Sequence, residues 1–213
     1  MNLKVWLAEF IGTFALLFAG IAAIAAGATE LAISLAFGLT VAVMISAVGA
    51  LSFAHFNPAV TLGFFMMRRI GFKELLLYWS AELLGACFAL LSLKVVLGAK
   101  MLDSVAYGAT LPSSELSVLQ GLGIEVVLSF FLMFVIATCV IQKQPQAGLY
   151  IGFTVTLCAL AGGVFTGASM NPARSFAPAL FSGMWSHHWL YWLGPALGSS
   201  LASITARYLW QEA

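Results

Sequence analysis

Charged residues are scarce in this sequence. Only 8% of its 213 residues are charged, whereas a soluble domain carries about 25%, and 62% are hydrophobic. The mean hydropathy is +1.02. This composition excludes a soluble globular domain and predicts an integral membrane protein surrounded by the lipid bilayer. The nine basic and eight acidic residues nearly balance, so we expect no nucleic-acid partner.

Cysteine and other reactive groups are also few. The three cysteines, Cys87, Cys139 and Cys158, lie within apolar runs, and their spacing matches neither a metal site nor a disulfide framework. The sequence shows no recognisable nucleophile, metal-ligand cluster or pair of catalytic acids. We therefore expect no cofactor, no bound metal and no enzymatic activity.

Six apolar runs have the length needed to cross a membrane, which is about 20 residues for about 30 Å of hydrocarbon. So little chain is left outside these runs that function must lie within the helical bundle. We predict an all-α membrane protein with a single domain over residues 1–213. The runs cover residues 5–28, 31–53, 75–97, 116–141, 147–165 and 188–210.

The basic residues indicate an orientation. If the amino terminus is cytoplasmic, the inner face collects six of the nine basic residues, against Lys94 and Lys100 outside. Both termini are then cytoplasmic, and the protein is expected in a plasma membrane or a bacterial inner membrane. The six inner residues are Lys4, Arg68, Arg69, Lys73, Lys143 and Arg207.

The chain contains an internal repeat. Asn57-Pro58-Ala59 recurs as Asn171-Pro172-Ala173, and residues 8–18 resemble residues 124–134. This predicts two halves, about 1–100 and 116–213, joined by an extracellular loop. Three spans separate the two tripeptides, and because three is odd, the halves must have opposite orientations. An inverted repeat places its site at the midplane interface of the halves.

Each tripeptide carries the signals of a helix start. Asn is a favoured N-cap, and Pro is tolerated at the first helical position. The helices expected from Pro58 to about Met67 and from Pro172 to about Ser182 are too short to span, since ten residues rise only about 15 Å. We predict two re-entrant half-helices, and the irregular backbone before each, at 53–56 and 166–170, should line a water-filled cavity.

The runs SFAHFNPAVT at 52–61 and TGASMNPARS at 166–175, together with residues 8–13 and 36–41, resemble the paired signature of the aquaporin (major intrinsic protein) family. The resemblance covers the whole chain. It implies a homotetramer in which each subunit has its own pore. Such a pore passes water, and sometimes small neutral solutes, while excluding protons and ions.

The resemblance also implies roles for individual residues. Asn57 and Asn171 would donate to passing water, and Arg174, a charge inside the membrane, would stand at the outer constriction. Glu9 and Glu125 would accept hydrogen bonds from the re-entrant loops, although a proton relay is the other interpretation. The selectivity filter would be Phe37, Ala159, Ala168 and Arg174. The pore lining would include Ala54, His55, Phe56, Thr166, Gly167 and Ser169.

Departures from the family pattern leave the solute open. Water-selective members typically have a histidine where this chain has Ala159, which predicts a wider filter. Ser175 stands where glycerol-conducting members have Asp, and the second loop resembles that of the plant nodulin-like branch. Besides water, the candidates are glycerol, metalloids, hydrogen peroxide and ammonia. Glu82 stands where members of the family usually have Gln, and Phe53 stands where Gly is commoner.

Two other classes of function were considered. Inverted repeats with broken helices also occur in coupled secondary transporters. Such a transporter would need a titrating carboxylate, and only Glu9, Glu82 and Glu125 are available within the spans. A membrane enzyme is disfavoured by the lack of reactive groups. At the helix contacts, Gly194 and Gly198 are expected to allow close packing.

Overall fold

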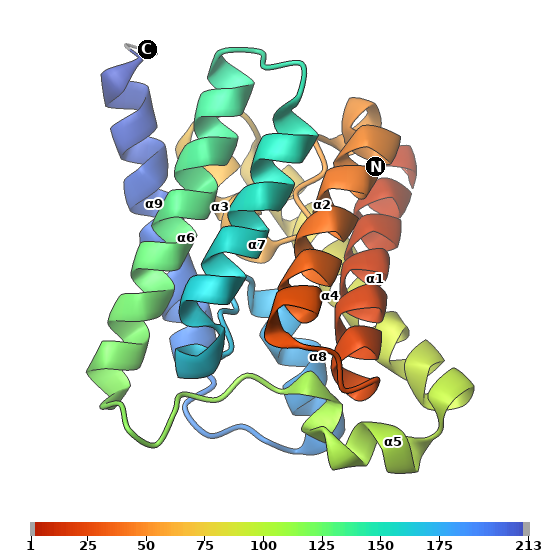
Figure 1. The fold of residues 1–213 in the computed structure, drawn as a ribbon. Coiled ribbons are helices and arrows are strands. Elements are labelled where there is room, and N and C mark those ends of the chain that lie inside the picture. Colours follow the sequence, from red (N-terminus) through yellow and green to blue (C-terminus); the bar gives the residue numbers. More distant parts are fainter. Residues whose placement is uncertain (1–2, 211–213) are drawn as a thin grey trace.

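The computed structural model describes residues 3–210, and all regular secondary structure in that range is helical; the ends of the expected domain, residues 1–2 and 211–213, lie outside it (Figure 1). Helix α1 begins, and helix α9 ends, at the same end of the bundle (Figure 1). The helices are α1 (Leu3–Ala25), α2 (Glu30–Ser52), α3 (Pro58–Met66), α4 (Phe72–Leu97), α5 (Ala99–Ser104), η1 (Ala106–Gly108), α6 (Val118–Ile141), α7 (Ala147–Thr166), α8 (Pro172–Ser182) and α9 (Leu190–Leu209).

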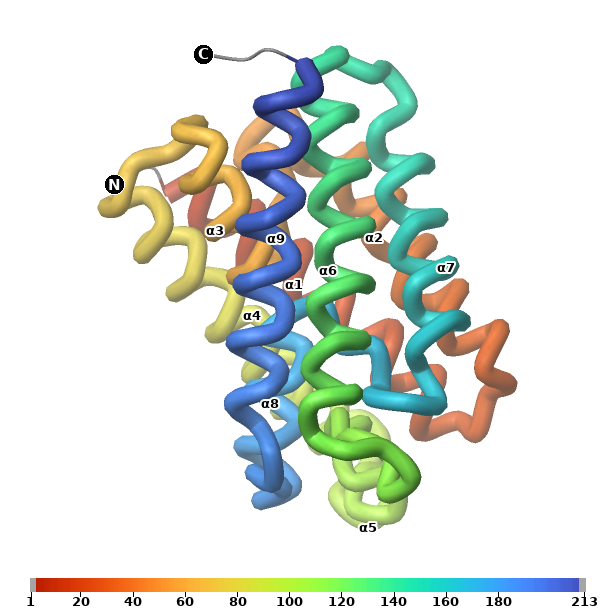
Figure 2. Tube along the Cα trace, turned by 90° about the vertical axis from the view of Figure 1, so that its left-hand side faces the viewer, coloured from red at the N-terminus to blue at the C-terminus, as the bar shows by residue number. Residues whose placement is uncertain are grey.

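Six long helices form the bundle. Five of them, α1, α2, α4, α6 and α7, are long and apolar enough to cross a membrane. The sixth, α9, has 20 residues and lies alongside α6, but Pro195 and Arg207 make it less apolar (Figure 2). The expected architecture of six long helices and two half-helices is confirmed.

The two halves interlock. Helix α1 packs against α4, and α6 packs against α9, so the first and last long helices of each half form equivalent pairs. Helices α2 and α7 pack against each other across the halves. Each half-helix packs more extensively against the last helix of the opposite half, α3 against α9 and α8 against α4. Neither half therefore encloses its own half-helix.

The half-helices begin where the sequence signals place them. Asn57 caps α3 and Asn171 caps α8, each from an extended conformation, and a proline follows at the first helical position. Helix α3 has nine residues and α8 has eleven. At 1.5 Å per residue they are roughly 14 and 17 Å long, about half of the hydrocarbon thickness.

The connection between the halves is more ordered than the expected plain loop. It contains α5 and η1 and lies at the end of the bundle opposite the termini (Figure 1). Leu102 and Tyr107 are buried there and tie the connection to the bundle. These anchors are isolated apolar residues in a mixed segment, so hydrophobic periodicity did not reveal them.

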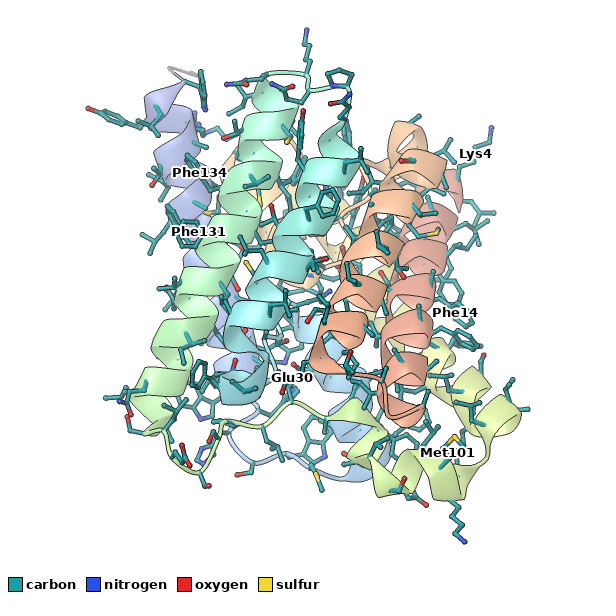
Figure 3. The ribbon with its side chains drawn as sticks, viewed as in Figure 1. Lys4, Phe14, Glu30, Met101, Phe131 and Phe134 are labelled. Carbon is teal, nitrogen blue, oxygen red and sulfur yellow. The ribbon has the colours of Figure 1, made fainter. Side chains whose placement is uncertain are left out.

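The outer surface of the bundle is apolar. Large hydrophobic side chains on α6 and α9, such as Phe131 and Leu201, are exposed. Phe131 lies on the side of the bundle and Lys4 near one end (Figure 3). This distribution suits a protein whose sides face hydrocarbon and whose ends face water.

Gly198 allows α9 to approach α6 closely. A Cβ at this position would lie 2.3 Å from the carbonyl oxygen of Val126 and 2.8 Å from the backbone nitrogen of Phe130. Both atoms belong to the backbone of α6, so neither can move aside without shifting the helix. By contrast, a Cβ at Gly123 of α6 would meet nothing within 4 Å.

We expect Gly198→Ala to lower the free energy of unfolding by about 1–3 kcal/mol, as overpacking does in close-packed interiors. The matched variant Gly123→Ala should be neutral or stabilising by up to about 1 kcal/mol, because Ala favours helix. Thermal unfolding of the detergent-solubilised protein compares the two. Equal effects would contradict a specific contact at Gly198.

Candidate functional site

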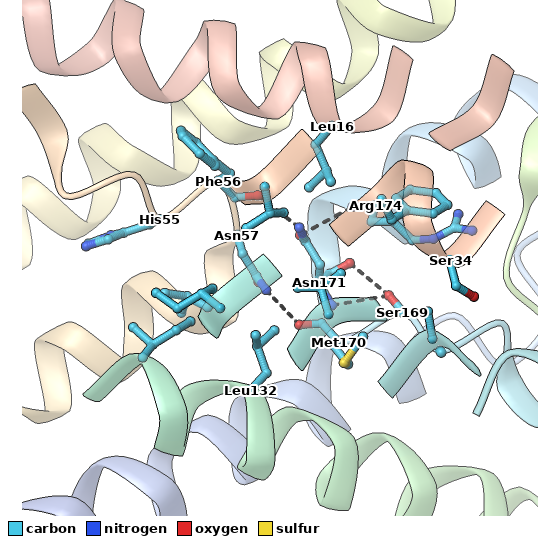
Figure 4. A pocket seen from close by; sticks show the side chains of 18 of the residues that line it. Leu16, Ser34, His55, Phe56, Asn57, Leu132, Ser169, Met170, Asn171 and Arg174 are labelled. Carbon is cyan, nitrogen blue, oxygen red and sulfur yellow. Dashed lines mark hydrogen bonds between the residues drawn. The ribbon is translucent and has the colours of Figure 1, made fainter. Parts of the chain in front are cut away.

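The two asparagine caps bind each other's loops at the centre of the bundle. Asn57 Nδ2 donates to the carbonyl of Met170 at 2.8 Å, and Asn171 Nδ2 donates to the carbonyl of Phe56 at 2.9 Å (Figure 4). Each Oδ1 accepts from its own half-helix, from Ala59 N and from Ala173 N. Each amide group has two hydrogens, so one N–H of each asparagine is left after the bond to the opposite loop.

Two buried carboxylates hold the loops in place. Glu9 accepts from the backbone nitrogens of His55 at 3.0 Å and Phe56 at 2.7 Å. Glu125 accepts from those of Ser169 at 2.9 Å and Met170 at 2.8 Å. Both side chains are fully buried. Both oxygens of each carboxylate therefore accept loop N–H groups that have no partner in a helix or sheet.

Residues around the two loops form equivalent hydrogen bonds in the two halves of the chain. Tyr78 donates to the carbonyl of Ser52, and Tyr191 donates to the carbonyl of Thr166. The expectation that Thr166 lines the pore is not met. Its side chain is fully buried, and its hydroxyl donates to Glu125 Oε1 at 2.7 Å. Thr166 closes the end of α7 and supports the loop because its hydroxyl is within reach of that carboxylate.

Both loops follow the same unusual backbone path. In each copy, three residues adopt positive φ, which costs a non-glycine residue roughly 1–2 kcal/mol. Such strain persists only where surrounding contacts hold it. Gly167 takes this conformation freely, whereas its counterpart Phe53 does not. The six residues are Phe53, Ala54 and Phe56 in the first loop, and Gly167, Ala168 and Met170 in the second.

A continuous cavity of about 540 Å³ passes the two asparagines. One face of α2 lines it from Glu30 to Ala50, and one face of α7 lines it from Ala147 to Val164. Since α2 has 23 residues, the cavity runs along a helix about 35 Å long. Among the expected pore residues, the lining includes Ala54, His55, Phe56, Gly167 and Ser169.

The four expected filter residues all line this cavity, toward the end that carries η1. Arg174 is buried, its guanidinium carbon lies 5.0 Å from the centre of the Phe37 ring, and Nη1 donates to the carbonyl of Gly108 at 2.7 Å. Ala159 and Ala168 supply only methyl groups. The filter formed by these four residues thus has one cationic donor, one aromatic face and two small walls.

Gly108 is a site residue that the sequence reasoning missed. Its carbonyl fixes the Arg174 guanidinium, and it adopts a φ of 68°, which favours glycine. A glycine after an aromatic residue in a connecting segment is a weak signal for such a role. A set of apolar lining residues was also missed, because its members look like ordinary packing residues. It comprises Leu16, Val60, Leu132 and Ile136.

The two loops differ in the chemistry of one side-chain network. In the first, Thr61 Oγ1 donates to Glu82 Oε1 at 2.6 Å and lies 2.9 Å from His55 Nδ1. The Thr61 hydroxyl therefore links the Glu82 carboxyl to the His55 ring. In the second, the equivalent Ser175 meets only hydroxyls, those of Ser169 and Thr110, each at 2.6 Å.

Comparison with known proteins gives a consistent result. The family model described as "Major intrinsic protein" matches residues 1–206. Aquaporin TIP4-2 of Zea mays is 40% identical over 212 residues, which cover 92% of this chain and 80% of that protein. Aquaporin NIP1-1 of Zea mays is 40% identical over 202 residues, which cover 91% of this chain and 70% of that protein.

The fold also matches a solved structure. The X-ray structure of the aquaglyceroporin from Plasmodium falciparum superposes with a TM-score of 0.83, covering 100% of both chains at 24% sequence identity. At this identity the likeness shows the fold and carries no inference about the solute.

Glu125→Gln tests the support of the second loop. An amide offers one accepting oxygen, so one of the N–H groups of Ser169 and Met170 would face a donor. Leaving a buried donor unsatisfied costs about 1–3 kcal/mol, and we expect a corresponding loss of thermal stability with reduced conduction. Glu115→Gln makes the same change at an exposed position. A Glu125→Gln protein as stable as this control would contradict the assigned role.

Proposed function

This chain belongs to the major intrinsic protein family, and we propose that it is a passive water channel that excludes protons and ions and also admits small neutral solutes. Membership makes it a membrane channel and not an enzyme. The observation that carries the proposal is the cavity along α2 and α7. It follows both helices for nearly their whole length and passes beside the two half-helix tips.

The cavity wall combines polar and apolar groups. Asn57 and Asn171 present N–H groups, and the adjoining loop residues bring backbone carbonyls, whose acceptor sites no helix or sheet satisfies. Leu16 and Leu132 add apolar surface to the lining. A water molecule in such a passage finds donors and acceptors along a single track, which favours a narrow column over a wide aqueous pore.

Proton exclusion follows from the half-helix tips. Each helix amino terminus carries the equivalent of about half a positive charge, and α3 and α8 both begin at the centre of the cavity. The positive ends of half-helices disfavour cations and protons. The free N–H of each asparagine would also donate to the central water oxygen, so that this water could not accept a proton along the column.

The filter supports a solute larger than water. Arg174 is held by Gly108 and therefore stays in place. Opposite it, Ala159 and Ala168 leave room that a histidine would fill. Arg174 gives donors to a neutral solute and repels cations. The small walls favour compact polar molecules such as glycerol, urea or hydrogen peroxide in addition to water.

Two of the three carboxylates available for coupling favour a channel over a coupled transporter. Glu9 and Glu125 each have both oxygens occupied by loop backbone. Releasing either one to carry a proton would break the loop that holds the asparagine. Flux that stays linear with the gradient and is unaffected by a protonophore would agree with this interpretation.

The topology and assembly complete the proposal. The end of the bundle that carries both termini also carries the turn between α6 and α7, with Lys143, and the turn after α3, with Arg68 and Arg69 (Figure 1). The positive-inside rule then favours this end as the cytoplasmic one, and we propose that the membrane is a plasma membrane or a bacterial inner membrane. We further propose a homotetramer with one pore in each subunit.

Water conduction is tested by stopped-flow light scattering. Proteoliposomes that contain the protein should shrink faster than empty liposomes under an osmotic gradient, with a low activation energy. A pH-sensitive dye inside the same vesicles should report no added proton leak. Shrinkage traces that cannot be distinguished from those of empty liposomes would rule out the water channel.

Ala159→His tests the width of the filter. The imidazole should fill the space beside Arg174 and lower glycerol and urea flux by about tenfold or more, within the range that steric discrimination in a pocket provides. Water flux should fall much less. Ala159→Ser, which keeps the wall small, should leave solute flux nearly unchanged. Equal losses of water and solute flux in the histidine variant would contradict this account of Ala159.

A further inference from the structure

A second hollow lies outside the pore, at the end of the bundle that carries both termini. It has a volume of about 620 Å³ and is formed by the end of α3, the turn into α4 and the last turns of α9. It shares no lining residue with the pore cavity. Helix α3 therefore runs from the pore, which its N-cap Asn57 lines, to this hollow, which its last residue Met66 lines.

Arginines from two distant segments converge on the hollow. Arg68 and Arg69 follow α3, and Arg207 lies in the last turn of α9. Arg207 Nη1 approaches the carbonyl of Met66 at 3.5 Å, which brings the two segments together. Arg68 is exposed and adopts a φ of 59°, a conformation that an arginine rarely takes.

Among the lining residues that the structure describes, arginines outnumber acidic residues by three to one. Glu74 caps the start of α4, where its Oε2 accepts from the backbone nitrogen of Gly71 at 2.7 Å. Three guanidinium groups thus share the hollow with one carboxylate that is already engaged at a helix end. The lining has a net positive charge and suits an anion.

The hollow is also partly apolar. Its apolar lining residues include Phe65, Met66 and Ile204, and Ile204 is 54% exposed. Leu201, one turn nearer the middle of the bilayer on α9, is exposed as well. A ligand seated here would meet cations where the helices end and hydrocarbon surface where they enter the membrane.

We propose that this hollow binds the headgroup of an anionic phospholipid, with Arg68 and Arg207 on the phosphate and the acyl chains along α9. Guanidinium groups bind phosphate oxygens through paired hydrogen bonds. Basic pockets between membrane helices are suited to anionic headgroups. The apolar surface below the arginines favours a lipid over free phosphate.

Native mass spectrometry of the detergent-solubilised protein tests the proposal. Phosphatidylglycerol and phosphatidylcholine with identical acyl chains are titrated against the unmodified protein and the double variant Arg68→Gln/Arg207→Gln. Each basic residue near a membrane surface contributes enough for the pair to change affinity by about tenfold to thirtyfold. We expect phosphatidylglycerol binding to fall by that factor, with little change for phosphatidylcholine.

The control variant, Lys94→Gln/Lys100→Gln, removes the same charge from exposed positions at the opposite end of the bundle. It should bind phosphatidylglycerol like the unmodified protein. Arg68→Gln alone changes only an exposed side chain in a turn, so it tests the site even if the double variant fails to fold. Binding uses no flux measurement, so its result is independent of the proposed channel activity.

Three results would overturn the proposal. Equal loss of phosphatidylglycerol in the arginine and lysine variants would indicate a general charge effect. Equal affinity of the unmodified protein for the two lipids would exclude a headgroup site for anions. Displacement of the lipid by inorganic phosphate at similar concentration would indicate a site for free phosphate.

Discussion

Backbone groups that have no helical partner at the centre of a membrane must be satisfied by the protein itself, and the rest of this structure depends on that constraint. Two loops bring such backbone to the middle of the bundle. Glu9 and Glu125 accept their N–H groups, the two tyrosines donate to the carbonyls where α2 and α7 end, and each asparagine bonds the opposite loop. The loop backbone groups that face away from the cavity thereby find hydrogen-bond partners within the protein.

The proposed function depends on the side of the loops that faces the cavity. With their N–H groups bound to carboxylates, the loops are left with acceptor groups on the side of the cavity. The half-helices add positive ends at the same depth. The arrangement that stabilises the loops is therefore the one that makes a polar track through an apolar bundle. Glu9 and Glu125, buried carboxylates that would suggest proton transfer in isolation, serve here as fixed anchors.

Much of this could be predicted from the sequence, because the relevant signals are local or periodic. Apolar runs gave the spans, Asn and Pro gave the half-helix starts, and the odd number of spans between the tripeptides gave their opposite orientations. What could not be predicted depends on contacts between distant segments. The role of Gly108 requires knowing that the connection folds over Arg174, and that of Thr166 requires knowing that its hydroxyl reaches Glu125. The arginine hollow likewise needs Arg207 beside Met66.

The reciprocal bonds between Asn57 and Met170 and between Asn171 and Phe56 join residues 113 and 115 positions apart. During synthesis the first loop enters the membrane long before its partner has been made. Until the second half arrives, the carbonyl of Phe56 and the amide of Asn57 must find other partners, such as water or translocation machinery. The reciprocal bonds at the centre of the pore therefore cannot form until residues 170 and 171 have been made, and a chain that stalls before them lacks half of the groups that build the path.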